Sequence, residues 1–169
     1  MEPLTRTVRV VTTESVDVQQ LADVAARTFP LACPASMAPE NIAAFVDANL
    51  TAAHFAAYLE DPRRAILTAT QDDRIIGYAM LIRDDDTAEL SKIYVAPEHH
   101  GTGVASALMD LALTTADEWH VDRLWLGVNQ ANERAQRFYA KSGFVVSGTR
   151  TFQVGAGREN DFVMTRPLP

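Results

Sequence analysis

Residues 88–105, with the sequence AELSKIYVAPEHHGTGVA, lead from an extended segment through a short turn into a helix. Residues 88–95 favour a strand, and an apolar stripe at helical spacing begins at Val104. Gly101 and Gly103 lie where that helix begins. The first amides of a helix have no intrahelical acceptor, and glycine leaves the backbone bare, so this junction is suited to a phosphate. The alternative is a tight strand-to-helix turn without a ligand.

The apolar residues of this strand are out of phase. Leu90, Ile93 and Val95 cannot share one face under strict alternation, because the step from 90 to 93 is odd. One extra residue near Ser91 or Lys92, a β-bulge, would restore the phase and leave backbone groups for an extended ligand. A regular strand with Lys92 on a mixed surface is the other interpretation, and the sequence leaves both open.

Strands and helices alternate along the rest of the chain, which indicates an α/β fold. Its 169 residues, of which 47% are hydrophobic, predict a single domain over 1–169. Pro30 and Pro34 are expected to end the first helix, which Ser15 or Asp17 can cap. Strands are expected at 5–12, 65–70, 74–83, 88–95, 121–128, 143–154 and 158–168, and helices at 18–28, 39–50, 51–61, 104–119 and 129–144.

The overall charge and composition exclude several classes of protein. With 22 acidic and 15 basic residues, the formal charge of −7 disfavours general attraction to nucleic acid or an anionic membrane. It suits a cationic partner, although moderate acidity also serves solubility. No apolar run reaches the roughly 20 residues that span a bilayer, and the lone Cys33 cannot form an internal disulfide. A soluble, cytoplasmic protein is expected.

Other cofactor motifs are missing from the sequence. No GxxxxGK[ST] occurs, and the glycines at 101 and 103 do not complete G-x-G-x-x-G. His54, His99, His100 and His120 form no HExxH or other ligand pattern, so no metal is expected. Whatever binds at the glycine turn must be held mostly by backbone.

A second informative stretch is NQANERAQRFYAKSGF, residues 129–144. Asn132, Ala135 and Tyr139 are three and four residues apart, so they share one helix face, and Gly143 is a natural helix stop. The simplest alternative for Tyr139 is a core aromatic with its hydroxyl at the rim.

The two stretches together resemble the GCN5-related N-acetyltransferase (GNAT) family over most of the chain. HGTGVA is similar to the family's pyrophosphate turn, [Arg/Gln]-x-x-Gly-x-[Gly/Ala], and NERAQRFYAKSGF to its Asn-x-x-Ala-x-x-x-Tyr helix followed by Gly-Phe. The resemblance implies an acetyl-CoA-dependent N-acetyltransferase. It also implies a mixed, mostly antiparallel twisted sheet of about six to seven strands with about four to five helices, splayed or bulged at the acetyl-CoA site.

The resemblance implies a role for each matching residue. The backbone at Ile93, Tyr94 and Val95 would meet the pantetheine arm, Asn132 would bind the cofactor farther along, and Tyr139 would stand near the thioester sulfur. His100 departs from the family's Arg or Gln, so a side-chain contact with phosphate is in doubt there. The pyrophosphate would lie on the amides of Gly101, Thr102, Gly103, Val104, Ala105 and Ser106.

The expected chemistry follows from the protonation of an amine. A free alkylamine with a pKa near 10 is mostly protonated at neutral pH, so a base must act before it attacks a thioester. Glu89 is the candidate base, directly or through a water that Ser91 positions; an exposed strand carboxylate is the alternative. Tyr139 would protonate the leaving thiolate. Direct transfer needs no covalent intermediate, and Cys33 is distant in sequence from both motifs.

The acceptor is harder to infer. The segment from Phe29 to Leu59 resembles the acceptor side of the polyamine acetyltransferase branch, and Glu40, Asp47 or Glu89 could meet the ammonium groups of a polyamine or another small cationic amine. A protein N-terminus is the second candidate acceptor. A non-catalytic acyl-CoA sensor is the alternative from another class, and a homodimer is one assembly to test.

Overall fold

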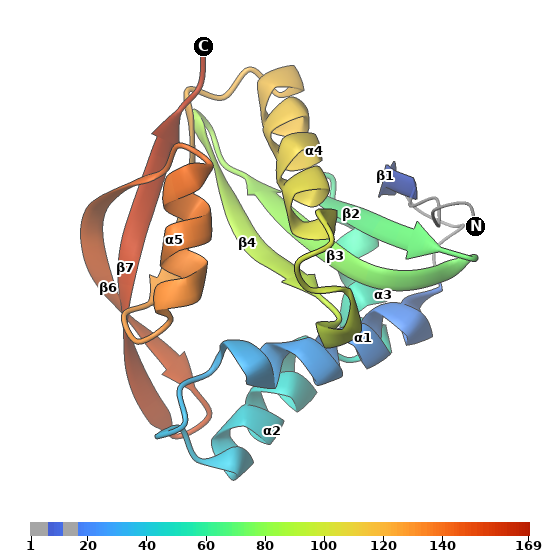
Figure 1. Ribbon diagram of the computed structural model, residues 1–169, viewed down its shortest axis with the longest axis vertical. Helices are drawn as coiled ribbons and strands as arrows, with labels where there is room; N and C mark the ends of the chain where they lie inside the picture. Colours follow the sequence, from blue (N-terminus) through green and yellow to red (C-terminus); the bar gives the residue numbers. More distant parts are fainter. Residues whose placement is uncertain (1–6, 12–16) are drawn as a thin grey trace.

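The computed structural model describes residues 7–11 and 17–169, with side chains described from Asp17 onward. They form a seven-stranded sheet in the order β1-β2-β3-β4-β5-β7-β6, with helices on both faces (Figure 1). The strands are β1 (Thr7–Val11), β2 (Arg64–Gln71), β3 (Arg74–Arg83), β4 (Thr87–Val95), β5 (Arg123–Asn129), β6 (Val145–Val154) and β7 (Gly157–Pro167). The helices are α1 (Val18–Ala32), α2 (Pro39–Asn49), α3 (Ala52–Glu60), α4 (Val104–Glu118) and α5 (Glu133–Lys141), with a 3-10 turn at Pro97–His99.

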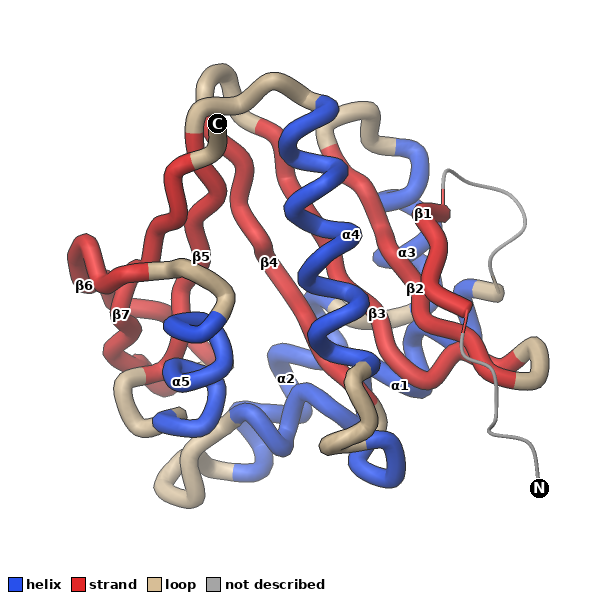
Figure 2. Tube along the Cα trace, turned by 45° about the horizontal axis from the view of Figure 1, so that its top comes forward, coloured by secondary structure: helices blue, strands red, loops and turns tan. Residues whose placement is uncertain are grey.

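The sheet is mixed and mostly antiparallel, as the resemblance implied. Its one parallel pair among the described residues joins β4 to β5, and that pairing covers only Thr87–Glu89 and Arg123–Trp125. Beyond these residues the two strands diverge, as the tube view shows (Figure 2). The sheet is therefore split between its fourth and fifth strands.

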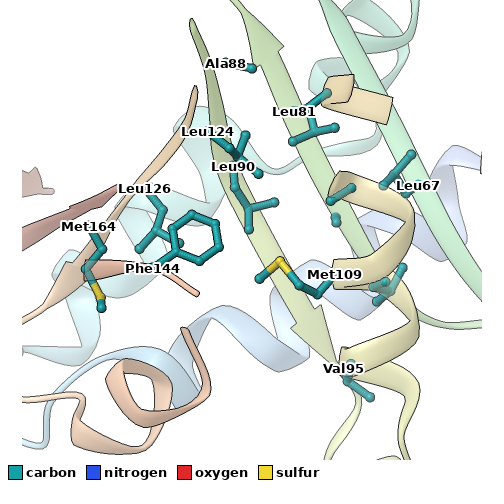
Figure 3. Close-up of a cluster of buried hydrophobic side chains, with 14 of the residues drawn as sticks. Leu67, Leu81, Ala88, Leu90, Val95, Met109, Leu124, Leu126, Phe144 and Met164 are labelled. Atoms are coloured by element: carbon teal, nitrogen blue, oxygen red, sulfur yellow. The ribbon is translucent and has the colours of Figure 1, made fainter. Parts of the chain in front are cut away.

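Two hydrophobic cores lie on opposite faces of the sheet. On one face, α4 packs across β2, β3 and β4, where Met109 of the helix meets strand residues such as Leu81 and Leu90 (Figures 2 and 3). On the other face, α1, α2 and α3 pack around Phe29, Phe55 and Tyr78. Residues of α1, α3 and α4 are thus buried in these cores, whereas α2 and α5 pack more peripherally.

The predicted β-bulge is confirmed at Ser91. Lys92 pairs with Met80 and Leu90 pairs with Leu81, so Ser91 is the extra residue on β4. The bulge lets Leu90, Ile93 and Val95 all contact the α4 core. Glu89 and Lys92 instead lie opposite Ile82 and Met80, whose side chains belong to the other core, so both turn toward the α1–α3 face.

The predicted elements are confirmed in kind and order, with one correction. Pro30 does not end the first helix: α1 continues to Ala32, because a proline in the last turn removes only one helical hydrogen bond. Asp17 caps this helix by accepting from the amides of Gln19 and Gln20 at 2.9 and 3.3 Å. The first strand is described over Thr7–Val11, whereas the rest of predicted strand 5–12 and the Ser15 cap lie outside the described residues.

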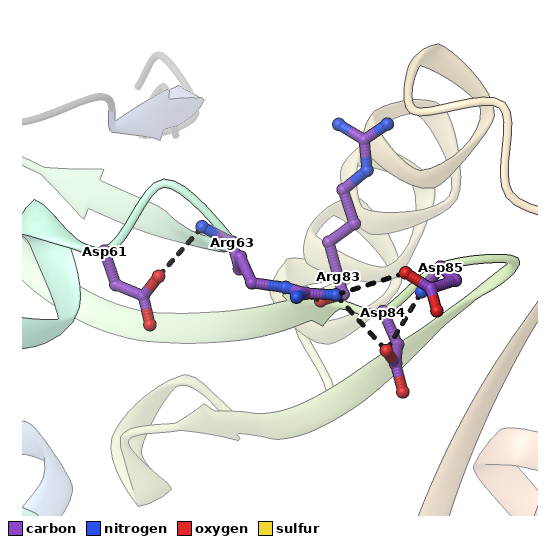
Figure 4. A network of polar contacts seen from close by, with 5 residues as sticks. All are labelled: Asp61, Arg63, Arg83, Asp84 and Asp85. Atoms are coloured by element: carbon purple, nitrogen blue, oxygen red, sulfur yellow. Dashed lines mark hydrogen bonds and ion pairs between the residues drawn. The ribbon is translucent and has the colours of Figure 1, made fainter.

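A polar network joins the start of β2 to the β3–β4 turn (Figure 4). Arg63 Nη2 lies 3.2 Å from Asp84 Oδ1 and 3.9 Å from Asp85 Oδ1, and all three side chains are exposed. Exposed pairs of this kind contribute less than about 1 kcal/mol.

Within the described residues, no single helix is long and apolar enough to cross a membrane. The helices α2 and α3 pass such a test only when taken together, and they bend by 43° at their junction.

Candidate active site

A cavity of about 750 Å³ occupies the split between β4 and β5. Its walls include Val104 and Tyr139 from the α4 side of the sheet and Phe29, Tyr58 and Tyr94 from the other side. The cavity therefore passes through the sheet, so two reactants can meet in it from opposite faces.

The glycine turn forms one end of this cavity. Gly101 has φ +75°, and Gly103, the N-cap of α4, has φ +87°, a conformation that favours glycine. A Cβ at either position would meet no described atom within 4 Å, so the turn opens to space. The first helical hydrogen bond runs from Ala107 N to Gly103 O, which leaves the preceding amides for an anionic ligand.

The edge of β4 that faces the cavity carries unpaired backbone. Between Leu90 and Val95 this strand pairs with β3, and among the described residues it has no partner on the β5 side. At its end, His100 Nε2 donates to the Val95 carbonyl at 2.7 Å. The histidine that replaces the family's Arg or Gln is thus bonded to the strand end.

Glu89 lies in an ion-pair cluster that sequence analysis missed. Arg150, on β6, has its Nη1 3.8 Å from Glu89 Oε2. The Nε of Arg150 donates to Oδ2 of Asp161, on β7, at 3.2 Å. Burial raises the pKa of the Glu89 carboxyl, while the cations of Arg150, Lys92 and Arg64 oppose that rise. Glu89 is a half-buried carboxylate in the cavity, so the exposed-strand alternative is excluded.

Lys92 is a second half-buried charge on the same wall. Its Nζ donates to Ser91 Oγ at 3.4 Å, and no carboxylate of the described residues lies within 4 Å of it. Burial lowers the pKa of its ammonium group to about 8, with Glu89 opposing and the cations of Arg64 and Arg150 adding to the shift. In the sequence, the odd step between Leu90 and Ile93 was the signal that could have indicated which face of the sheet Lys92 lies on.

Tyr139 reaches the cavity from α5. The helix is capped by Asn132, whose Oδ1 accepts from Ala135 N at 3.2 Å, and the Tyr139 ring packs edge-on against Phe138 and Phe144. Burial raises the pKa of the Tyr139 hydroxyl well above its usual value, so the group is neutral at any physiological pH.

Most of the residues predicted for the site line this one cavity. Three predicted residues lie outside the lining: Thr102, whose hydroxyl donates to the His99 carbonyl, and Glu40 and Asp47 on α2. The predicted residues that do line it are Glu89, Ser91, Ile93, Tyr94, Val95, His100, Gly101, Gly103, Val104, Ala105, Ser106, Asn132 and Tyr139.

Cys33 lines the cavity too, although it is distant in sequence from both motifs. Burial, reinforced by the charge of Glu159, raises the pKa of its thiol to about 11, so the nucleophilic thiolate is scarce near neutral pH. Over the described part of the chain, no three His, Cys, Asp or Glu residues gather as a metal site.

Comparison with known proteins decides the family. The model of the acetyltransferase (GNAT) family matches residues 19–144, which include the glycine turn, the bulged strand and Tyr139. The chain belongs to this family. It is therefore an N-acetyltransferase with acetyl-CoA as its acetyl donor, as the two motifs implied.

Relatives and solved structures agree with this assignment. An uncharacterized N-acetyltransferase of Mycobacterium tuberculosis, Rv2669, is 66% identical over 153 residues, which cover 90% of this chain and 98% of that protein. The peptidyl-lysine N-acetyltransferase YjaB of Escherichia coli is 30% identical over 107 residues, covering 59% of this chain and 67% of that protein.

Two solved structures share the fold at low identity. The PaiA N-acetyltransferase of Thermoplasma acidophilum, crystallised with coenzyme A, superposes with a TM-score of 0.81 at 19% identity and covers 95% of this chain and 99% of its own. The ribosomal-protein-S18-alanine N-acetyltransferase of Escherichia coli gives 0.73 at 23% identity and covers 97% and 94%.

Proposed function

We propose that this GNAT enzyme transfers the acetyl group directly from acetyl-CoA to a primary amine inside the cavity between β4 and β5. The observation that supports this most is the cavity's passage through the sheet. Bare amides and Tyr139 lie at its α4–α5 side, and the half-buried Glu89 lies on the wall that faces α1–α3. A donor and an acceptor can thus enter from different faces.

The chain's own backbone fits the donor. The amides of residues 101–106 would hold the pyrophosphate, since the turn opens to space and the helix N-terminus favours anions. The unpaired edge of β4 at Ile93–Val95 would pair with the amides of the pantetheine arm. Acetyl-CoA supplies an acetyl group activated as a thioester.

Glu89 would take the proton of the incoming ammonium group. Its raised pKa makes the carboxylate a stronger base than a solvent-exposed glutamate, while Arg150 at 3.8 Å opposes that rise and so favours the ionised form. The neutral amine then attacks the thioester carbonyl: a C–N bond forms, the C–S bond breaks, and one proton is released overall.

Tyr139 would stabilise the leaving sulfur as a hydrogen-bond donor. Because the pKa of its hydroxyl lies well above that of a thiol, complete proton transfer to the thiolate is uphill. The hydroxyl therefore lends a hydrogen bond as charge develops, and the sulfur keeps a proton ultimately derived from the amine.

The cavity lining bears differently on the two predicted classes of acceptor amine. Of the three acidic residues expected to meet a polyamine, only Glu89 lines the cavity, which weakens that prediction. The relatives named for peptidyl-lysine and for ribosomal-protein alanine keep a peptide amine as the second candidate. A non-catalytic acyl-CoA sensor would need neither Glu89 nor Tyr139 in the cavity.

A thiol-release assay with acetyl-CoA tests this function. The acceptor panel should hold spermidine, amino acids, aminoglycosides and peptides with free N-termini, and the variants Glu89→Gln and Tyr139→Phe should be run beside the native enzyme. Acceptor-dependent release that falls in both variants supports the proposal. Measurable acetyl-CoA binding without release for any acceptor would favour the sensor. Sedimentation of the same sample tests the homodimer.

A further inference from the structure

We propose that the acceptor carries a carboxylate besides its amine, and that Lys92 and Arg64 hold this carboxylate in the cavity. This inference rests on the proposed function and names its substrate class: amino acids or related zwitterionic amines rather than polyamines.

Lys92 is the cation of this wall that forms no salt bridge with a described residue, although Glu89 lies near enough to oppose the fall of its pKa. Among the described residues, its Nζ has one hydrogen bond, to Ser91 Oγ at 3.4 Å, and no carboxylate within 4 Å. A half-buried ammonium group without an anionic partner is costly, and burial lowers its pKa accordingly. A ligand carboxylate would supply the missing charge.

Arg64 lies beside Lys92 on the same wall. Met80 pairs across the sheet with Lys92, and Arg64 Nη1 donates to the sulfur of the same Met80 at 3.8 Å. The guanidinium is stacked 4.7 Å over the Tyr58 ring, and its Nε is bonded to Asp61 at 3.1 Å. Because sulfur is a weak acceptor, the Nη side of this rigidly held group can still bind a carboxylate.

Arg150, the third cation of the wall, already contacts two carboxylates, whereas Arg64 is ion-paired with Asp61 alone. The Nε of Arg150 is bonded to Asp161 at 3.2 Å and its Nη1 faces Glu89 at 3.8 Å. An incoming carboxylate is therefore expected at Lys92 and Arg64, which leaves Glu89 to receive the ammonium end of the same molecule. A polyamine would instead bring a second ammonium group against these two cations.

Matched pairs of acceptors measure how much the carboxylate contributes to recognition apart from the amine. Glycine, β-alanine, γ-aminobutyrate and L-methionine are each compared with the corresponding carboxamide, which keeps the size and removes the charge, and with putrescine and spermidine. Thiol release from acetyl-CoA is measured with the full chain. We expect kcat/KM to be at least about tenfold higher for one or more acids than for the matching carboxamide and for both polyamines.

The variant Lys92→Met should lower kcat/KM for the preferred acid about tenfold more than for its carboxamide, because only the acid loses an ion pair. Lys92→Arg should retain part of the preference, which guards against a folding defect in Lys92→Met. The control is Arg63→Met, because Arg63 is exposed and bonded to Asp84 away from the cavity (Figure 4).

The outcomes distinguish this inference from the proposed function. Release with carboxamides or polyamines as good as with every acid would overturn the inference and leave amine acetylation standing. Equal losses for acid and carboxamide in Lys92→Met would also overturn it. If none of the acceptors gives thiol release, the proposed function itself is overturned.

Discussion

Arg150 on β6 places its guanidinium in the space that a side chain at Gly127 on β5 would occupy. A Cβ built on Gly127 would overlap Nη2 and Cζ of Arg150. The missing side chain therefore lets a cation from β6, three positions from β4 in the sheet order, reach Glu89 on β4.

Gly127→Ala should displace Arg150 and break its ion pair with Glu89. We expect about a tenfold fall in kcat/KM but a loss of less than about 1 kcal/mol in the free energy of unfolding, because the displaced guanidinium is the flexible end of a side chain. Acetyl transfer rates and denaturant unfolding measure the two effects. Gly148→Ala is the matched control, since a Cβ at that position meets no described atom within 4 Å. If Gly127→Ala and Gly148→Ala have the same kcat/KM and the same stability, a side chain at Gly127 does not displace Arg150.

Arg150→Met should shift the acid limb of the pH–rate profile to higher pH. The Arg150 cation lowers the pKa of Glu89 against the effect of burial, so its removal lets that pKa rise further. Glu89 must be deprotonated to act as a base, and the pH at which kcat/KM reaches half its maximum rises with its pKa. Arg158→Met, an exposed change on β7, should leave the limb in place. An unmoved limb in Arg150→Met would remove Glu89 from the role of base.

Tyr139→Phe should lower kcat by about tenfold to a hundredfold while KM for acetyl-CoA stays within about twofold, because the hydroxyl acts as the C–S bond breaks. Steady-state kinetics measure both constants. Tyr78→Phe is the control: its buried hydroxyl has no hydrogen-bond partner among the described residues, so its removal should keep activity and cost no stability. Unchanged turnover in Tyr139→Phe would exclude the tyrosine from the chemistry.

Lys92→Met should be more stable than the native enzyme at pH 7 and lose that advantage at high pH. The pKa of Lys92 falls from 10.5 to about 8 on folding, so the unfolded chain binds more protons between these values and native stability rises with pH across that window. Below about pH 8 the folded state carries the full cost of the buried cation, and we expect a difference of about 1–3 kcal/mol there.

Urea unfolding of both proteins at pH 7 and pH 10 measures this difference. A stability difference that is the same at both pH values would show that Lys92 titrates normally in the folded protein.

The sequence by itself determined the parts of this protein that depend on neighbouring residues. The odd step from Leu90 to Ile93 indicated a bulge as one of two alternatives, and the structure places the extra residue at Ser91. The glycines before Val104 and the spacing of Asn132 and Tyr139 likewise predicted a turn and a helix that are both present. Such features follow from backbone conformation and side-chain periodicity, which short stretches encode.

Only the tertiary structure decided which charges share the cavity. Arg150 is far from Glu89 in sequence, and the pairing of β5, β6 and β7 brings the two together. Glu40, on α2, lies outside the cavity lining, although charge alone had made it a candidate. The pKa of Lys92 likewise depends on burial among residues from separate strands. Long-range strand pairing and desolvation arise only when the whole sheet is assembled, so local sequence patterns do not specify them.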